Sequence, residues 1–464
     1  MTELWKFGAL ELADKIRAKE VSSREVLEAH LDRVAQVNPD LNAIVRLLTD
    51  EARDAADAAD RATAAGTATG RFHGVPMTVK ENIDVAGHPT TQGVPMLADA
   101  IASCDAPTVA RLRAAGAIPF ARTNLPDFGL RVHTDSSLHG LTRNPWDQRF
   151  TVGGSSGGEG SALASGMSPL GLGNDIGGSL RNPAHCCGIA SIKPTVGVVP
   201  MATVIPPEDM MIAAQLMVVE GPMARQIGDV RAAFEIVSGA DIRDPRSLPV
   251  TLTDLLPGQK LRVAVMASPP GGTTNAGIAA GVNRAAKALT DAGHEVVEVT
   301  PPHYEEVLQL WAALLVGDIR VQRPMLDMVM GDAAKAVLDG LDLGVPALGL
   351  TEVLGLHARR FALMRTWSEF FADYPVLLSP TWAHPPFEHG ADLTNTELVL
   401  DTLRPVLPAN FLALPAVIVP TGIDNGMPVS VQIIGDRFTD LRCLAIGAQV
   451  EQALGRITPI DPVR

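Results

Sequence analysis

The order of apolar and polar residues along the chain predicts helices that alternate with short buried strands. Ser22 and Glu25 form a capping box, and the apolar residues that follow recur at helical spacing. The pair Asn38-Pro39 is expected to end this helix. Residues 75–80 are apolar up to Lys80, which predicts a buried strand with the lysine at its end. Further expected elements of the N-terminal part are helices over 50–65 and over 107–115, the latter capped by Asp105, and a strand over 117–121.

The C-terminal part continues this alternation after a segment, 195–258, that has no clear period. A strand, a helix and a strand are expected over 261–266, 277–292 and 295–299, which is the order of a βαβ unit. Residues 303–372 read as largely helical. Three more apolar strands and a closing helix are expected over 376–379, 417–420, 429–434 and 440–454. This pattern favours the α/β class and gives no sign of a domain boundary.

The stretch from Thr151 to Thr195 interrupts the pattern with glycine and serine. It contains two serine clusters flanked by glycines, GGSSGG at 153–158 and GGS at 177–179, and a helix is expected from Gly158 to Ser165. Apolar runs lie between these clusters, which is unlike the polar composition of a flexible linker. Glycine in a buried loop lets the backbone approach a ligand closely. The stretch is therefore the first candidate for a functional site.

Composition narrows the classes of function. The chain has 464 residues, of which 46% are hydrophobic and 19% charged, so it can build a large core. Its net charge of −14 argues against nucleic acids and anionic membranes as partners. The four cysteines, which we expect to be buried thiols, are too few for a disulfide framework, and histidine spacing gives no metal site. With no signal peptide and no long apolar segment, a cytoplasmic protein without a membrane span is expected.

Two blocks of the sequence resemble those of the amidase signature hydrolases. They are GGSSGGEGSALASG followed by GNDIGGSLRNPA, and an upstream lysine block from Gly74 to Gly87. The resemblance extends over nearly the whole chain. It implies one α/β domain over residues 1–464, with a large mixed, twisted sheet flanked by helices on both faces. It also implies a signature core at about 70–200 and a variable, substrate-shaping region at about 225–375.

The resemblance assigns roles to individual residues. Ser179 is similar to the family's nucleophile, Lys80 to its general base, and Ser155 to the bridging serine, which follows a cis peptide bond. The backbone N–H groups that would hold the oxyanion are those of Ile176, Gly177, Gly178 and Ser179. The residues expected at the substrate are Gly129, Leu130, Gly154, Ser156, Asn174 and Asp175. The family needs no metal and no organic cofactor.

These residue types suit acyl transfer. A serine hydroxyl becomes a good nucleophile only when a base takes its proton. Lysine can be that base only when neutral, and burial lowers its pKa from about 10.4. The apolar run before Lys80 provides such a setting. Backbone N–H groups then stabilise the negative oxygen, each by on the order of 3 kcal/mol.

Several alternatives stay open at this point. The sequence GSSGG at 154–158 also fits the nucleophile elbow G-x-S-x-G, in which Ser156 would be the nucleophile. The reaction expected here is hydrolysis of the C–N bond of a small amide, possible substrates being aliphatic, aryl or fatty acid amides, lactam oligomers, carbamates and esters. The chain could instead be the glutaminase subunit of a tRNA-dependent amidotransferase, or a catalytically silent binding protein. A monomer or a homodimer is expected.

Overall fold

A computed structural model describes residues 3–206 and 209–463 of the chain. The strands of its main sheet are β1 (Ile44–Leu47), β2 (Pro76–Lys80), β3 (Ile118–Thr123), β6 (Leu170–Asp175), β7 (Ala190–Lys193), β8 (Val219–Ala224), β9 (Arg262–Val265), β10 (Glu295–Glu298), β11 (Val376–Pro380), β12 (Ala416–Asp424) and β13 (Met427–Gly435). Within the described residues they form one mixed sheet in the order β1-β3-β2-β6-β8-β7-β12-β13-β11-β9-β10. A separate ribbon joins β4 (Asp135–Ser136) and β5 (Gly140–Leu141).

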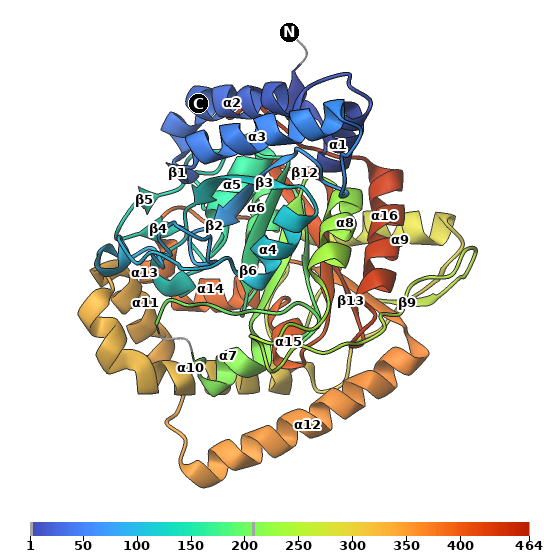
Figure 1. The fold of residues 1–464 in the computed structure, drawn as a ribbon. Coiled ribbons are helices and arrows are strands. Elements are labelled where there is room, and N and C mark those ends of the chain that lie inside the picture. Colours follow the sequence, from blue (N-terminus) through green and yellow to red (C-terminus); the bar gives the residue numbers. More distant parts are fainter. Residues whose placement is uncertain (1–2, 207–208, 464) are drawn as a thin grey trace.

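Helices pack on both faces of the sheet (Figure 1). They are α1 (Ala9–Arg17), α2 (Ser23–Leu41), α3 (Thr49–Ala64), α4 (Pro107–Ala114), α5 (Gly157–Ala164), α6 (Arg181–Cys187), α7 (Ile212–Met217), α8 (Ile227–Val237), α9 (Ala276–Asp291), α10 (Tyr304–Val329), α11 (Asp332–Leu343), α12 (Leu350–Asp373), α13 (Ala391–Thr394), α14 (Thr396–Leu403), α15 (Leu407–Phe411) and α16 (Asp440–Leu454). The long α12 lies at the bottom of the view, and its buried residues share a core with residues of the sheet. The predicted α/β class and two-sided sheet are confirmed.

Strand β12 illustrates why the central strands read as continuous apolar runs. Successive side chains of a strand point to opposite faces of the sheet. Val417 and Val419 belong to the core that includes residues of α8, α9 and α16. Ala416 and Ile418 belong to the core that includes residues of α6, α10 and α12. Both faces are buried, so the strand needs apolar residues at every position instead of alternate ones.

Most of the elements predicted from the pattern are present, with boundaries shifted by a few residues. The parallel pairing of β9 with β10 confirms the βαβ unit, and the closing helix has the predicted bounds. The capping box of Ser22 and Glu25 is also present.

Two predicted ends of helices are wrong. Helix α2 continues through Pro39 to Leu41, since the Asn38 side chain holds the backbone of Ala43 and Ile44 instead of ending the helix. Helix α4 is preceded by Ala106 as its N-cap, because the Asp105 carboxylate accepts the N–H of Ala86.

The prediction missed the two strands within the glycine-rich stretch, β6 and β7, and the strand β8 that follows it. Strand β6 contains two glycines, which are depleted in strands. The sequence pattern also gave no clear indication of strands β7 and β8 or of helix α8.

Three of the four cysteines, Cys186, Cys187 and Cys443, are buried as expected, whereas Cys104 is half-buried beside Arg243. In the described residues no helix is long and apolar enough to cross a membrane.

Candidate active site

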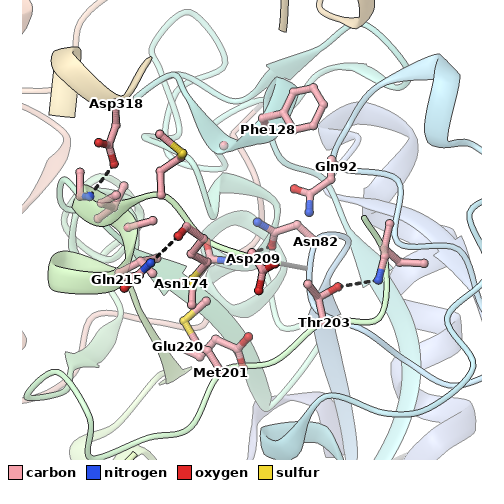
Figure 2. Close-up of a pocket in the computed structure, with 18 of the residues that line it drawn as sticks. Asn82, Gln92, Phe128, Asn174, Met201, Thr203, Asp209, Gln215, Glu220 and Asp318 are labelled. Carbon is pink, nitrogen blue, oxygen red and sulfur yellow. Dashed lines mark hydrogen bonds between the residues drawn. The ribbon is translucent and has the colours of Figure 1, made fainter. Parts of the chain in front are cut away.

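A cavity of about 540 Å³ opens between the end of β6, the loop at 128–130, the segments 201–206 and 209–220, and helix α10. Ser155 and Ser179, the two serines predicted to act in catalysis, both line it. Figure 2 shows side chains gathered around this space, with Phe128 and Gln92 on one side and Gln215 and Asp318 on the other. The sheet therefore brings the two glycine-rich clusters to one cavity.

Lys80 lies at the end of β2, fully buried behind the cavity wall. Its Nζ donates to Ser155 Oγ at 2.7 Å and to Asn174 Oδ1 at 2.6 Å. The peptide bond between Gly154 and Ser155 is cis, as the family resemblance implied. At Gly129, where φ is +69°, an added Cβ would lie 3.0 Å from Ser155 Oγ, so this position leaves the serine room. The predicted lysine and bridging serine are thus in direct contact.

Burial lowers the pKa of Lys80 to about 7, against the opposing influence of Asp175, Glu159 and Glu220. The carboxyl of Glu159 on α5 accepts hydrogen bonds from Thr78 and Thr123, and burial raises its pKa to about 8. At and above neutral pH, burial of Lys80 therefore makes its uncharged amine accessible, and the nearby Glu159 keeps its proton up to a pH of about 8. An uncharged lysine has the lone pair that a general base requires.

The turn that carries Ser179 is organised by Asp175 at the end of β6. Its carboxylate accepts the N–H groups of Gly178 and Leu180 and forms a buried ion pair with Arg181. Asn410 also donates to this carboxylate. Burial opposes its charge, but Arg181 outweighs burial and lowers the pKa of Asp175 to about 2. The ion pair therefore fixes the start of α6 and the serine before it.

One predicted oxyanion donor is engaged elsewhere. Because the N–H of Gly178 donates to Asp175 at 2.8 Å, it is not available to a substrate oxygen in this arrangement. In the described part of the chain, the N–H groups of Ile176, Gly177 and Ser179 donate to no protein acceptor. An added Cβ at Gly177 would lie 2.9 Å from the Trp311 ring, which explains the need for glycine there. Three of the four predicted donors remain candidates.

The six predicted substrate-contacting residues separate into two groups. Gly129, Leu130 and Asn174 line the cavity, whereas Gly154, Ser156 and Asp175 do not. Each of the second group is engaged by the protein itself; Ser156 Oγ, for example, lies 3.4 Å from the carbonyl oxygen of Asn174.

The structure does not support the hypothesis that Ser156 is the nucleophile of a G-x-S-x-G elbow. Ser156 is fully buried and does not reach the cavity. The residues that precede it, 151–155, form no strand, although a nucleophile elbow requires a strand that leads into the turn. Ser156 is therefore a structural residue beneath β6.

The sequence reasoning missed several residues of the site. Asn82 accepts a hydrogen bond from Asn174 Nδ2 at 3.0 Å, and Phe128 and Glu220 line the cavity. Asn82 could have been found as a polar residue two positions after Lys80. No sequence pattern indicated Glu220, because it lies in the segment 195–258, where apolar residues recur at neither helical nor strand spacing.

Comparison with known proteins places this geometry in a family. The family model described as Amidase matches residues 25–444. The chain belongs to this family. It is 40% identical over 458 residues to the indoleacetamide hydrolase of Bradyrhizobium diazoefficiens, covering 97% of this chain and 87% of that protein. It is 32% identical to a glutamyl-tRNA(Gln) amidotransferase subunit from Salinispora tropica, covering 99% of each chain.

Solved structures agree with the family. The structure of a bacterial aryl acylamidase, which belongs to the amidase signature enzymes, has a TM-score of 0.83 and 27% sequence identity, covering 96% of each chain. Together with the family match, these relatives identify the protein as an amidase, a hydrolase that acts on carbon–nitrogen bonds.

The ion pair of Asp175 and Arg181 generates a prediction about stability. Substituting Asp175→Ala leaves a buried guanidinium without its partner, so we expect unfolding to become easier by about 3–5 kcal/mol in urea denaturation at pH 7. Because the pKa of Asp175 is lowered, the ion pair contributes fully to the free energy of unfolding above the ordinary carboxyl pKa. This contribution is lost as the pH falls toward 2. Asp147→Ala, which breaks the exposed pair with Arg149, is the control and should cost less than about 1 kcal/mol. Equal effects of the two substitutions would contradict this account.

Proposed function

We propose that this amidase hydrolyses its substrate through an acyl-enzyme on Ser179, with Ser155 and Lys80 as the proton path. The observation that carries the proposal is the 2.7 Å contact between Lys80 Nζ and Ser155 Oγ, made by a buried lysine directly behind a cavity that Ser179 lines. A lysine that is uncharged near neutral pH can accept a proton. A serine between it and the nucleophile can relay one.

The proposed reaction begins with a proton shift. Neutral Lys80 keeps one N–H on Asn174 Oδ1 and turns its lone pair toward the Ser155 hydroxyl. Ser155 passes its proton to Lys80 and takes the proton of Ser179, whose oxygen attacks the amide carbon. The N–H groups of Ile176, Gly177 and Ser179 are the proposed donors to the negatively charged oxygen. The stored proton then returns through Ser155 to the departing nitrogen.

Hydrolysis of the acyl-enzyme follows the same path in reverse order. A water molecule loses its proton to Ser155 and Lys80 and attacks the ester carbon. The bond to Ser179 breaks, and the serine oxygen recovers the proton. The products are a carboxylic acid and ammonia or an amine, and the enzyme returns to its starting state.

For the substrate, we propose a small amide whose acyl group includes an aromatic or similarly compact apolar part. Phe128, Leu130, Ile176 and Leu315 give the cavity apolar walls of matching size. The names of the indoleacetamide hydrolase and the aryl acylamidase support an aryl-bearing substrate. The identity to the amidotransferase subunit is lower, 32% against 40%, so the glutaminase alternative has less support.

The substrate-shaping region, the location and the oligomeric state are also proposals. The variable region at about 225–375 is proposed to shape the substrate site, which the cavity-lining residues Leu315, Ile319 and Leu326 of α10 support. The net charge of −14 supports a protein that binds no nucleic acid. A cytoplasmic location and a monomeric or homodimeric state stay proposals.

The role of Ser179 can be tested with a reactive fluorophosphonate. We expect the label on Ser179 in peptide mass spectrometry, and we expect Ser179→Ala to lower amide turnover by about 10³-fold or more while its circular dichroism matches the wild type. Ser156→Ala is the control, since that serine does not reach the cavity. A label on Ser156, or more than a tenth of the wild-type rate in Ser179→Ala, would exclude Ser179 as the nucleophile.

The pKa of Lys80 predicts a pH profile. Because the lysine acts as a base only when uncharged, kcat/KM should rise with pH through an apparent pKa of about 7 and then level off. Asn174→Asp places a carboxylate beside Nζ, favours the charged lysine and should shift the rise upward by about one unit or more. Asn174→Ser is the matched uncharged control and should show no upward shift. A wild-type-like rate in Lys80→Ala at pH 7 would disprove the role of the lysine.

The substrate proposal is tested by turnover assays on the purified chain. We expect phenylacetamide and indole-3-acetamide to be hydrolysed with kcat/KM at least about tenfold above that of glutamine or hexadecanamide, because a short aromatic acyl group fits the apolar cavity. Release of ammonia is the readout. Preference for glutamine would favour the amidotransferase alternative, and no hydrolysis of any amide would favour a silent protein.

A further inference from the structure

Glu220 is a carboxyl group that faces the cavity and that the proposed reaction does not use. It lies on β8 directly opposite Asn174 of β6, so both side chains project from the same face of the sheet. The residue is only 3% exposed. Thr108 Oγ1 donates to its Oε2 at 2.5 Å. Among the described residues, no donor contacts the other oxygen, Oε1, although the side chain lines the cavity (Figure 2).

The charged groups around Glu220 do not supply a partner. Lys80 is close enough for Glu220 to influence its pKa, but its Nζ donates to Ser155 and Asn174. Asp84 accepts from the Thr90 hydroxyl and the Val204 N–H, so it adds negative charge only. Arg246 is held by Asp244 in a nearly buried ion pair. Burial, together with the neighbouring Asp84 and Asp244, raises the pKa of Glu220 to about 8, against the opposing influence of the Thr108 hydrogen bond and Arg246. The pocket next to Glu220 thus holds more acidic groups than cations.

A buried carboxyl with one oxygen left without a donor suits one kind of ligand group. A carboxylate that is removed from water is stabilised most by a positively charged N–H donor at hydrogen-bond distance. The protein brings no such donor to Oε1, as far as the described residues show, and the open side of the group is the substrate cavity. A protonated amine on the substrate would supply both the missing hydrogen bond and the missing positive charge.

We propose that Glu220 is a substrate-binding residue that recognises a protonated amine on the amide substrate. The inference rests on the function proposed above and narrows it from aryl-bearing amides to amides that also contain an amino group. It makes Glu220 a determinant of specificity with no part in the proton path.

The position of Glu220 limits where the amine lies on the substrate. Asn174, its partner across the two strands, contacts Lys80, and Lys80 contacts Ser155 beside the nucleophile. Side chains directly opposite each other on neighbouring strands have Cβ atoms about 5 Å apart. The amine that reaches Glu220 is therefore separated from the scissile carbonyl by a short part of the substrate. We expect an amino amide of compact size.

The test compares three amino amides with uncharged partners of the same shape. Phenylglycinamide and the 3- and 4-(aminomethyl) derivatives of phenylacetamide place the amine at three positions, and each is paired with the analogue in which a methyl group replaces the ammonium. We expect the wild type to prefer the amine in kcat/KM by about tenfold or more in at least one pair. Preference for the methyl analogue in all three pairs would overturn the proposal.

Glu220→Gln tests the residue itself. Glutamine keeps the size and can still accept from Thr108, but it cannot become negatively charged. The ratio of amine to methyl analogue should fall to about one. Asp318→Asn is the matched control: it removes a carboxylate from the same cavity, one that the N–H of Ala213 already occupies, and should keep the wild-type ratio. If Glu220→Gln left the ratio of amine to methyl analogue unchanged, the assignment of Glu220 would be overturned. If Asp318→Asn lowered this ratio as much as Glu220→Gln does, the preference for amines would reflect the overall charge of the cavity, which would also overturn the assignment.

Binding to the inactive Ser179→Ala protein gives a readout that does not depend on turnover. Glu220 carries a proton at pH 7 in the free protein, and an ammonium beside it favours the carboxylate. Calorimetry in buffers of different ionisation enthalpy should therefore show proton release with the preferred amine, none with its methyl analogue, and none after Glu220→Gln is added. Binding without this release would contradict the proposal even if Glu220→Gln failed to fold. Hydrolysis of none of the amides by the wild type would refute the proposed function, while these binding experiments would still decide the role of Glu220.

Discussion

The structure depends on keeping a lysine out of water. Lys80 can serve as a base near neutral pH only because burial makes its charged form costly. Ionised carboxylates close by would reverse this effect by favouring the ammonium. Glu159 and Glu220 both lie near Lys80, and burial raises the pKa of each to about 8, so the same exclusion of water suppresses their charge as well. In the free protein, Glu159 and Glu220 are thus held protonated near Lys80, while Asp175, paired with Arg181, is the ionised carboxylate that opposes the lowering of the Lys80 pKa.

Asp175 shows that burial alone does not decide which state a carboxyl group adopts. It is as deeply buried as Glu159, yet its pKa is lowered to about 2 because Arg181 lies beside it. The resulting charge is used to hold the N–H groups of Gly178 and Leu180. The protein therefore places an ionised carboxylate, balanced by Arg181, at the serine turn, and protonated carboxyl groups elsewhere around the lysine.

The cavity combines this rigid base with walls from distant parts of the chain. The strands β2 and β6 supply the lysine and its contact Asn174, while α10 and the segments 201–206 and 209–220 supply the opposite walls. Asp127 joins the two parts, since its carboxylate accepts the N–H of Gly331 at the turn between α10 and α11. Such a division lets the substrate walls differ between relatives while the reacting groups keep their places.

The α/β class and most elements could be predicted from the local period of apolar residues, and the candidate groups Lys80, Ser155 and Ser179 from two long motifs. Tertiary structure decided what no local pattern encodes. Gly178 donates to Asp175 instead of remaining free, and Ser156 lies beneath β6 instead of facing the cavity. Glu220 comes opposite Asn174 only through the antiparallel pairing of β6 with β8. Pairing of strands that are far apart in sequence depends on burial of the whole sheet, so no single segment contains that information.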